Sequence, residues 1–122
     1  MQEPNGNTMI LVALGDDKGT TWPLTAGQSY TIGRSRKCDL RLGDRTVSAR
    51  HAALESRQGL WIVRDLHSSH GTLVNKQRLL GPKPLFDRDT IQCGKTLLEF
   101  RSYEEPDPAD LLEIERGLSI RQ

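Results

Sequence analysis

The sequence predicts an all-β domain, and two observations support that prediction. Short apolar and β-branched segments follow one another along residues 9–103 and are separated by Gly, Asp, Asn or Pro. Side chains alternate within these segments, as where Trp61 and Val63 face one way and Ile62 faces the other, which is the period of a half-buried strand. This rhythm is typical of a β-sandwich or barrel.

Nine segments are expected to be strands because of their composition and the turn residues that flank them. Two turns, at residues 57–60 and 93–96, join neighbouring segments into antiparallel hairpins. The expected strands are 9–14, 20–24, 30–32, 40–42, 51–56, 60–65, 73–75, 90–93 and 96–103.

The 122 residues suit one folded domain with an extension at each end. Residues 1–8 are polar and are expected to be a flexible leader, residues 9–103 the domain, and residues 104–122 an acidic linker or docking helix. Asp107 is a candidate cap for that short C-terminal helix. One stripe of the helix would carry Leu111, Ile114 and Leu118.

Composition predicts the cellular setting. No apolar run approaches the roughly 20 residues that cross a bilayer, and residues 1–8 lack the apolar centre of a signal peptide. Cys38 and Cys93 lack the dense spacing of a secreted disulfide framework, which predicts buried free thiols. We therefore expect a soluble, intracellular (cytoplasmic) protein.

The formal net charge of +1 conceals two regions of opposite sign. Residues 33–52 carry a local charge of +4, whereas the last twenty residues carry −4. The basic middle region suits an anionic partner.

Three short patches look like parts of one anion-binding site, because each follows a strand-like segment at a loop. In the first patch, Gly33 lets the backbone turn and Arg34 offers a planar fork of donors to a phosphate. In the second, the Ser48 hydroxyl and neighbouring amides are suitable phosphate donors, and His51 is expected to hold the loop. The third patch, residues 69–72, reads as a tight turn in which Gly71 takes a positive φ and Thr72 bonds back into the loop.

Other functional classes fit the sequence less well. Ser48, His51 and Asp65 are the residue types of a hydrolase triad, but no nucleophile-elbow sequence surrounds the serine. His67, His70 and the two cysteines lack a recognised metal-ligand spacing, so neither a metal nor a cofactor is expected. Basic residues cluster, yet few aromatic residues are available for base stacking, which disfavours nucleic acid as a partner. We expect a binding protein and not an enzyme.

The three patches belong to a longer pattern that resembles the forkhead-associated (FHA) domain. Order and spacing agree over roughly residues 8–103. The matching positions are Ile32-Gly33-Arg34-Ser35, Cys38-Asp39-Leu40, Leu42, Val47-Ser48, His51-Ala52, Asp65-Leu66, Ser68, Gly71-Thr72, Val74-Asn75, Asp89, Ile91 and Gly94.

The resemblance implies a β-sandwich of about eleven mostly antiparallel strands whose apical loops bind a phosphothreonine in an extended peptide. It implies no catalytic activity and a partner phosphorylated in Ser/Thr kinase signalling, while the lack of a long apolar run predicts no membrane contact. The implied site residues are Arg34, Ser48 and Ser69 for the phosphate, Ala49 and His70 for the peptide, and Gly33, His51, Gly71 and Thr72 for the shape of the loops.

Three positions depart from the usual family pattern. His70 stands where an asparagine usually bonds the peptide backbone, and a neutral imidazole offers one donor and one acceptor with a different reach. Ala49 replaces a residue that is commonly polar or basic, and Arg88 replaces a usual glycine. The alternative function is a constitutive, phosphate-independent docking domain on an FHA scaffold, but the retained Arg34 and Ser48 favour the phosphothreonine reader.

Overall fold

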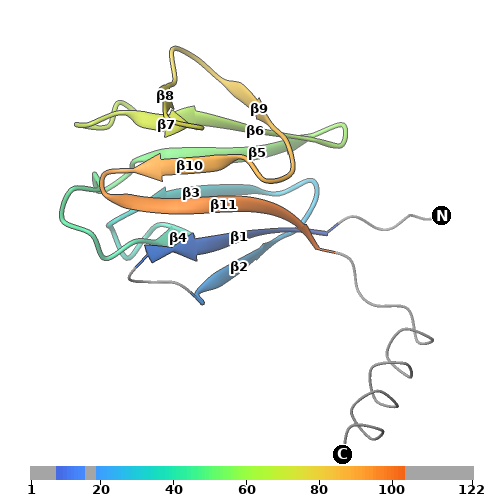
Figure 1. The fold of residues 1–122 in the computed structure, drawn as a ribbon, viewed down its shortest axis with the longest axis horizontal. Helices are drawn as coiled ribbons and strands as arrows, with labels where there is room; N and C mark the ends of the chain where they lie inside the picture. Colours follow the sequence, from blue (N-terminus) through green and yellow to red (C-terminus); the bar gives the residue numbers. More distant parts are fainter. Residues whose placement is uncertain (1–7, 16–18, 104–122) are drawn as a thin grey trace, which may run out of the picture.

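The computed structural model describes residues 8–15 and 19–103, which form eleven β-strands in two sheets (Figure 1). The strands are β1 (Thr8–Leu14), β2 (Thr21–Leu24), β3 (Ser29–Gly33), β4 (Leu40–Arg41), β5 (Ala52–Arg57), β6 (Leu60–Asp65), β7 (Thr72–Val74), β8 (Gln77–Arg78), β9 (Lys83–Leu85), β10 (Thr90–Cys93) and β11 (Thr96–Tyr103). One sheet has the order β2-β1-β11-β10-β7-β8 and the other the order β4-β3-β5-β6-β9. The pairing of β3 with β4 is parallel, and the other described pairings are antiparallel. The predicted β-sandwich is therefore confirmed.

The alternation expected from the sequence appears in both sheets. In β6, Trp61 and Val63 are buried while Arg64 is exposed. In β11, Leu98 and Phe100 are buried, with exposed fractions of 0% and 1%. Each sheet thus contributes one apolar face to the interior, as a sandwich requires.

Two edge strands, β8 and β9, were not among the nine expected segments. The β7–β8 turn is made by Asn75 and Lys76, which both have positive φ (50° and 71°), so it lacks the glycine that marks such a turn in a sequence. Strand β9 contains Pro84, a residue that is disfavoured inside a sheet because it lacks a backbone N–H. Because β9 is the edge of its sheet, the missing N–H of Pro84 interrupts no interior pairing.

The core lies between the two sheets and includes an aromatic group that links them. The rings of Tyr30 and Trp61 in one sheet have centroids 6.0 Å apart, and Trp61 meets Phe100 of the other sheet edge-to-face at 6.4 Å. Such aromatic pairs contribute about 0.5 to 1.5 kcal/mol beyond their buried area. Both thiols are free and buried, as predicted, at Cys38 and Cys93.

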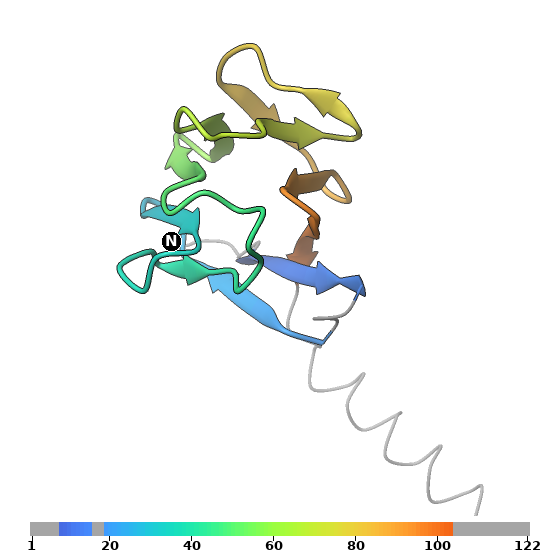
Figure 2. The same cartoon turned by 90° about the vertical axis from the view of Figure 1, so that its left-hand side faces the viewer.

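The sandwich has two distinct ends. The loops that carry the three patches lie at one end, on the left of Figure 1 and facing the viewer in Figure 2. Thr8 and Tyr103 are paired at the opposite end, where the described chain begins and stops. The expected C-terminal helix and residues 1–7 of the expected leader lie outside the described residues. Within the described part of the chain, no helix is long and apolar enough to span a bilayer.

Candidate functional site at the apical loops

Three loops meet beyond the ends of β3, β5 and β6 (Figure 2). Backbone hydrogen bonds tie these loops together. The amide of Arg34 donates to the carbonyl of Ser48 at 3.0 Å, which joins the first loop to the second. The amide of Leu66 donates to the carbonyl of His51 at 2.9 Å, which joins the second loop to the third. We call Arg34, Ser48, Ser69 and His70 on these loops the apical site.

His51 is fully buried between the loops, with an exposed fraction of 0%. Its Nδ1 accepts a hydrogen bond from the amide of Ser48 at 3.0 Å, so this nitrogen carries no proton. Its Nε2 lies 2.9 Å from the carbonyl oxygen of Gly71 and therefore donates to it. The neutral imidazole connects the backbone of the second loop to that of the third.

Gly33 allows the first two loops to approach closely. A Cβ atom at this position would lie 2.2 Å from the carbonyl oxygen of Ala49 and 2.8 Å from the sulfur of Cys38. The same carbonyl accepts hydrogen bonds from the amide of Ser35 at 3.1 Å and from the Cys38 thiol at 3.1 Å. The backbone of Ala49 therefore belongs to the loop framework, while its methyl group is exposed.

The Arg34 side chain is held by one hydrogen bond and otherwise faces solvent. Its Nε donates to the carbonyl of Val47 at 3.0 Å, which fixes the plane of the guanidinium. Its two terminal amino groups make no hydrogen bond within residues 8–15 and 19–103, and the side chain is exposed. Arg34 thus presents a fixed, unpaired donor fork, the group that matches a phosphate.

Ser48 and Ser69 lie side by side. The amide of Ser69 donates to the hydroxyl oxygen of Ser48 at 2.9 Å, which leaves the Ser48 hydroxyl proton free to donate outward. Ser69 and His70 are exposed on the third loop, and neither side chain makes a hydrogen bond to another described residue. The two hydroxyls and the imidazole can therefore turn toward a ligand.

The third loop is stabilised from below by Asp65 at the end of β6. Asp65 accepts hydrogen bonds from the amide of Ser68 at 3.0 Å, from the Ser68 hydroxyl, and from the Thr72 hydroxyl at 2.7 Å. Burial opposes ionisation of Asp65, but the hydrogen bonds outweigh it and hold its pKa below the ordinary value of 3.8. Thr72 therefore bonds back into the loop, and Gly71 has the positive φ (83°) that the turn requires.

Asp44 performs the same task for the second loop. It accepts hydrogen bonds from the amide and hydroxyl of Thr46 at 2.8 and 2.6 Å, and from the amide of Lys95 and the hydroxyl of Thr96. The hydrogen bond from the Thr46 hydroxyl is the largest reason that the pKa of Asp44 falls from 3.8 to about 2, against the opposing effect of burial. This carboxylate ties the second loop to the β10–β11 turn.

The carboxylates near the site accept hydrogen bonds from amides and hydroxyls of the loops, and within the described residues they form no ion pairs with the apical arginines. Asp39 accepts from the amide and hydroxyl of Thr31, as Asp44 and Asp65 accept from their own loops. The ion pairs found in the described residues involve Arg57, Arg64 and Arg101, none of which lies on the apical loops. Residues 33–52 carry a formal charge of +4, so basic side chains are in excess at this end, which suits an anionic ligand.

Arg78 is an apical residue that sequence reasoning missed. It lies at the end of β8, yet its Nε and Cζ atoms lie only 2.9 and 3.0 Å from where a Cβ of Gly71 would be. Its guanidinium therefore packs against the backbone of the third loop, next to His70. The strand that positions Arg78 was not expected from the sequence, so nothing indicated this contact.

The geometry excludes a hydrolase triad made of Ser48, His51 and Asp65. Both ring nitrogens of His51 are engaged by backbone groups, so neither contacts the Ser48 hydroxyl or the Asp65 carboxylate. Among the described residues, no group of three or more His, Cys, Asp or Glu side chains is arranged to hold a metal ion.

Comparison with known proteins identifies the family. The family model for the FHA domain matches residues 30–94, which include all three apical loops. A solved structure from a structural and functional analysis of phosphothreonine-dependent FHA domain interactions superposes with a TM-score of 0.72 at 31% identity, covering 80% of this chain and 99% of that one.

Two curated relatives are similar in sequence. The oxoglutarate dehydrogenase inhibitor of Corynebacterium efficiens is 35% identical over 97 residues, which are 80% of this chain and 67% of that protein. The glycogen accumulation regulator GarA of Mycolicibacterium smegmatis is 32% identical over 104 residues, which are 85% of this chain and 65% of that protein. The chain thus spans about two thirds of the length of the curated relatives it matches.

Proposed function

The chain belongs to the FHA family, and we propose that it is a phosphothreonine-dependent interaction module that binds a phosphorylated peptide at the apical site. One observation carries the residue assignment: the Arg34 guanidinium is fixed by Val47 and has no acidic partner among the described residues. The module acts by binding, with no catalytic step of its own. Its partner is a protein phosphorylated in Ser/Thr kinase signalling, which places it inside the cell.

Three groups would hold the phosphate. Arg34 would donate from its terminal amino groups, and the hydroxyls of Ser48 and Ser69 would add two more donors. Phosphothreonine carries about −1.5 to −2 charges, and each hydrogen bond to a charged group contributes about 1.5 to 3 kcal/mol. Two or three such bonds supply a large part of the roughly 8 kcal/mol that corresponds to micromolar affinity.

Peptide recognition beside the phosphate would fall to His70, Ala49 and Arg78. His70 replaces the usual asparagine but offers a donor and an acceptor for a peptide backbone. Ala49 contributes only its small, exposed side chain, because its carbonyl is used within the loops. Arg78 adds a positive charge next to the third loop, which favours acidic residues in the bound peptide.

The relatives indicate what such binding achieves. Two of them are named as an inhibitor of oxoglutarate dehydrogenase and a regulator of glycogen accumulation. We infer that this chain also acts by occupying a partner and changing what the partner does. The identity of that partner does not follow from the names of the relatives.

Titration with a degenerate phosphothreonine peptide pool tests the proposal, with unphosphorylated and phosphoserine pools as comparisons. We expect binding confined to the phosphothreonine pool. Arg34→Ala removes at least one charge-assisted contact, so its affinity should fall about 10- to 150-fold, the equivalent of about 1.5 to 3 kcal/mol.

Arg57→Ala is the matched control, because it removes the same charge from an exposed arginine at the opposite end of the sandwich. Its affinity should remain unchanged. Equal binding of all three pools, or Arg34→Ala behaving like Arg57→Ala, would overturn the proposal and favour phosphate-independent docking.

A further inference from the structure

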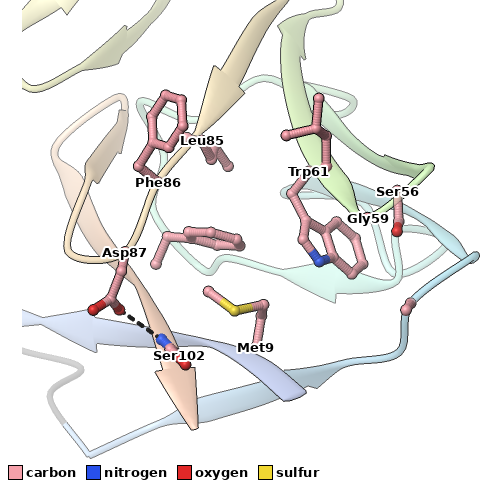
Figure 3. Close-up of a pocket in the computed structure, with 11 residues that line it drawn as sticks. Met9, Ser56, Gly59, Trp61, Leu85, Phe86, Asp87 and Ser102 are labelled. Carbon is pink, nitrogen blue, oxygen red and sulfur yellow. Dashed lines mark hydrogen bonds between the residues drawn. The ribbon is translucent and has the colours of Figure 1, made fainter. Parts of the chain in front are cut away.

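A second concave surface lies at the end of the sandwich opposite the apical loops (Figure 3). It is an open hollow of about 630 Å³ between the two sheets. Its lining comes from β1, β5, β6, β9 and β11 and from the β2–β3, β5–β6 and β9–β10 connections. Trp61 and Met9 reach into it from opposite sheets, with Phe86 at another side. We call this surface the basal hollow.

The basal hollow continues the hydrophobic core to the surface. Trp61 and Phe100 are core residues that also line it. Leu60 and Phe86, also in its lining, are 47% and 61% exposed. They are two of the three large apolar side chains exposed in the described residues. Exposed apolar side chains that adjoin a hollow continuous with the core are typical of a surface that binds another apolar group.

Positive charge and backbone strain occur beside the basal hollow. Arg88 follows the lining residue Asp87 and has a φ of 77°, a conformation that non-glycine residues adopt at a cost of about 1 to 3 kcal/mol. Arg57 follows the lining residue Ser56 and forms an exposed ion pair with Glu55 at 3.7 Å, whereas Arg88, also exposed, forms no ion pair within the described residues. The nearby carboxylate of Asp87 accepts a hydrogen bond from the amide of Ser102 at 2.7 Å and keeps its negative charge, so Arg88 supplies the unpaired positive charge at this surface. An acidic, apolar segment would fit this surface.

The chain itself supplies such a segment in residues 104–122. It continues from β11, whose Ser102 already lines the basal hollow. It carries six carboxylates against two arginines. Eight residues lead from Tyr103 to its first leucine and span up to about 28 Å, more than the distance of about 10 Å between packed sheets. Its large apolar residues are Leu111, Leu112, Ile114, Leu118 and Ile120.

We propose that residues 104–122 dock onto the basal hollow of their own chain. The leucines and isoleucines cover Leu60 and Phe86, and the carboxylates face Arg57 and Arg88. The apical site lies at the other end of the sandwich, so docking does not compete with a phosphopeptide. This proposal stands whether or not the apical site binds phosphothreonine.

Paramagnetic broadening in the full chain tests this docking. A nitroxide is attached to Ser119→Cys, and amide signals are recorded on 15N-labelled protein. The native thiols should not react, because both are buried and burial raises the pKa of Cys93 to about 12. We expect loss of the Gly59, Leu60 and Phe86 signals, with the signals of Ser48 and Ser69 retained.

Substitutions in residues 104–122 and in the hollow distinguish docking through apolar contacts from broadening caused only by the tethering of this segment near the hollow. Leu118→Asp should restore the signals of the hollow, whereas Gln122→Asp adds the same charge at a polar residue and should leave them broadened. Phe86→Ser, at an exposed position, should also restore the signal of Leu60.

A mixed sample identifies the occupant of the hollow. It contains chains that carry the nitroxide but no 15N, together with 15N chains that carry no nitroxide. Docking in cis predicts no broadening in this mixture. Broadening in the mixture would overturn the proposal in favour of a second copy. Two further results would also overturn docking in cis. One is the absence of broadening at the hollow in the chain that carries both 15N and the nitroxide, and the other is broadening that persists in Leu118→Asp. Either result would indicate that the hollow binds another protein.

Discussion

The apical and basal ends of this sandwich are built in opposite ways. At the apical end, three carboxylates and one imidazole are engaged by backbone amides, a backbone carbonyl and hydroxyls, and the arginines form no ion pairs with the part of the chain that the structure describes. At the basal end, the core itself reaches the surface through apolar side chains. Directional bonds fix the positions of a few donors, which suits a small charged group. Apolar area has no preferred direction and suits a longer segment.

The largest effect should follow removal of the imidazole that joins the apical loops. His51→Ala leaves the amide of Ser48 and the carbonyl of Gly71 unpaired, at about 1 to 3 kcal/mol each, and leaves a cavity. We expect the free energy of unfolding to fall by about 3 to 5 kcal/mol in urea titrations. His70→Ala, at an exposed histidine, is the control and should change stability by less than about 0.5 kcal/mol. Similar values for the two variants would contradict this role of His51.

A smaller loss should follow crowding between the first two loops. Gly33→Ala places a methyl group 2.2 Å from the carbonyl of Ala49, so the backbone must shift. Such overpacking costs about 1 to 3 kcal/mol. Gly43→Ala is matched, because nothing lies within 4 Å of its Cβ position, and it should leave the melting temperature nearly unchanged. Equal melting temperatures for Gly33→Ala and Gly43→Ala would show that the backbone of the apical loops can shift to accommodate the methyl group at little cost in stability.

The pH dependence of the free energy of unfolding should show how much the ionised Asp44 carboxylate stabilises the fold. The pKa of Asp44 is about 2 in the folded protein, against the ordinary value of 3.8 that we take for the unfolded chain, so folding favours the ionised carboxylate. That stabilisation is fully present above about pH 5 and is lost as pH falls toward 2, and a shift of this size corresponds to at most about 2.5 kcal/mol, which solvent screening reduces. Asp44→Asn should therefore be less stable than the parent at pH 7 in urea titrations, and the difference should shrink by pH 2. If the difference in unfolding free energy between the parent and Asp44→Asn does not change with pH, the loss of stability comes from altered packing and not from the charge of Asp44.

The sequence predicted the regular elements well, because alternation and turn glycines are local signals. Strands β6, β10 and β11 have the predicted bounds. Strand β8 was missed because Lys76 takes a left-handed conformation without glycine, and β9 was missed because the edge location that tolerates Pro84 is a tertiary property.

The apical residues were nameable from the sequence, but their connections were not. Arg34, Ser48 and His51 stood out through the family pattern. The sequence did not indicate that His51 bonds the carbonyl of Gly71, twenty residues away, or that Arg78 packs on that loop. Such contacts depend on which loops the sheet order brings together.

The smallest effect is expected from a substitution at the basal end, which should leave binding at the apical end unchanged. Leu60→Ser replaces a side chain that is already 47% exposed at the basal hollow, so the free energy of unfolding should change by less than about 1 kcal/mol. Phosphopeptide affinity, measured by titration calorimetry, should stay within about twofold, because no apical contact involves the β5–β6 turn. Arg57→Ala, on the same turn, is a second basal variant that should behave alike. A tenfold loss of affinity in Leu60→Ser would mean that the basal end influences the apical loops, and the two ends would then act as one coupled unit.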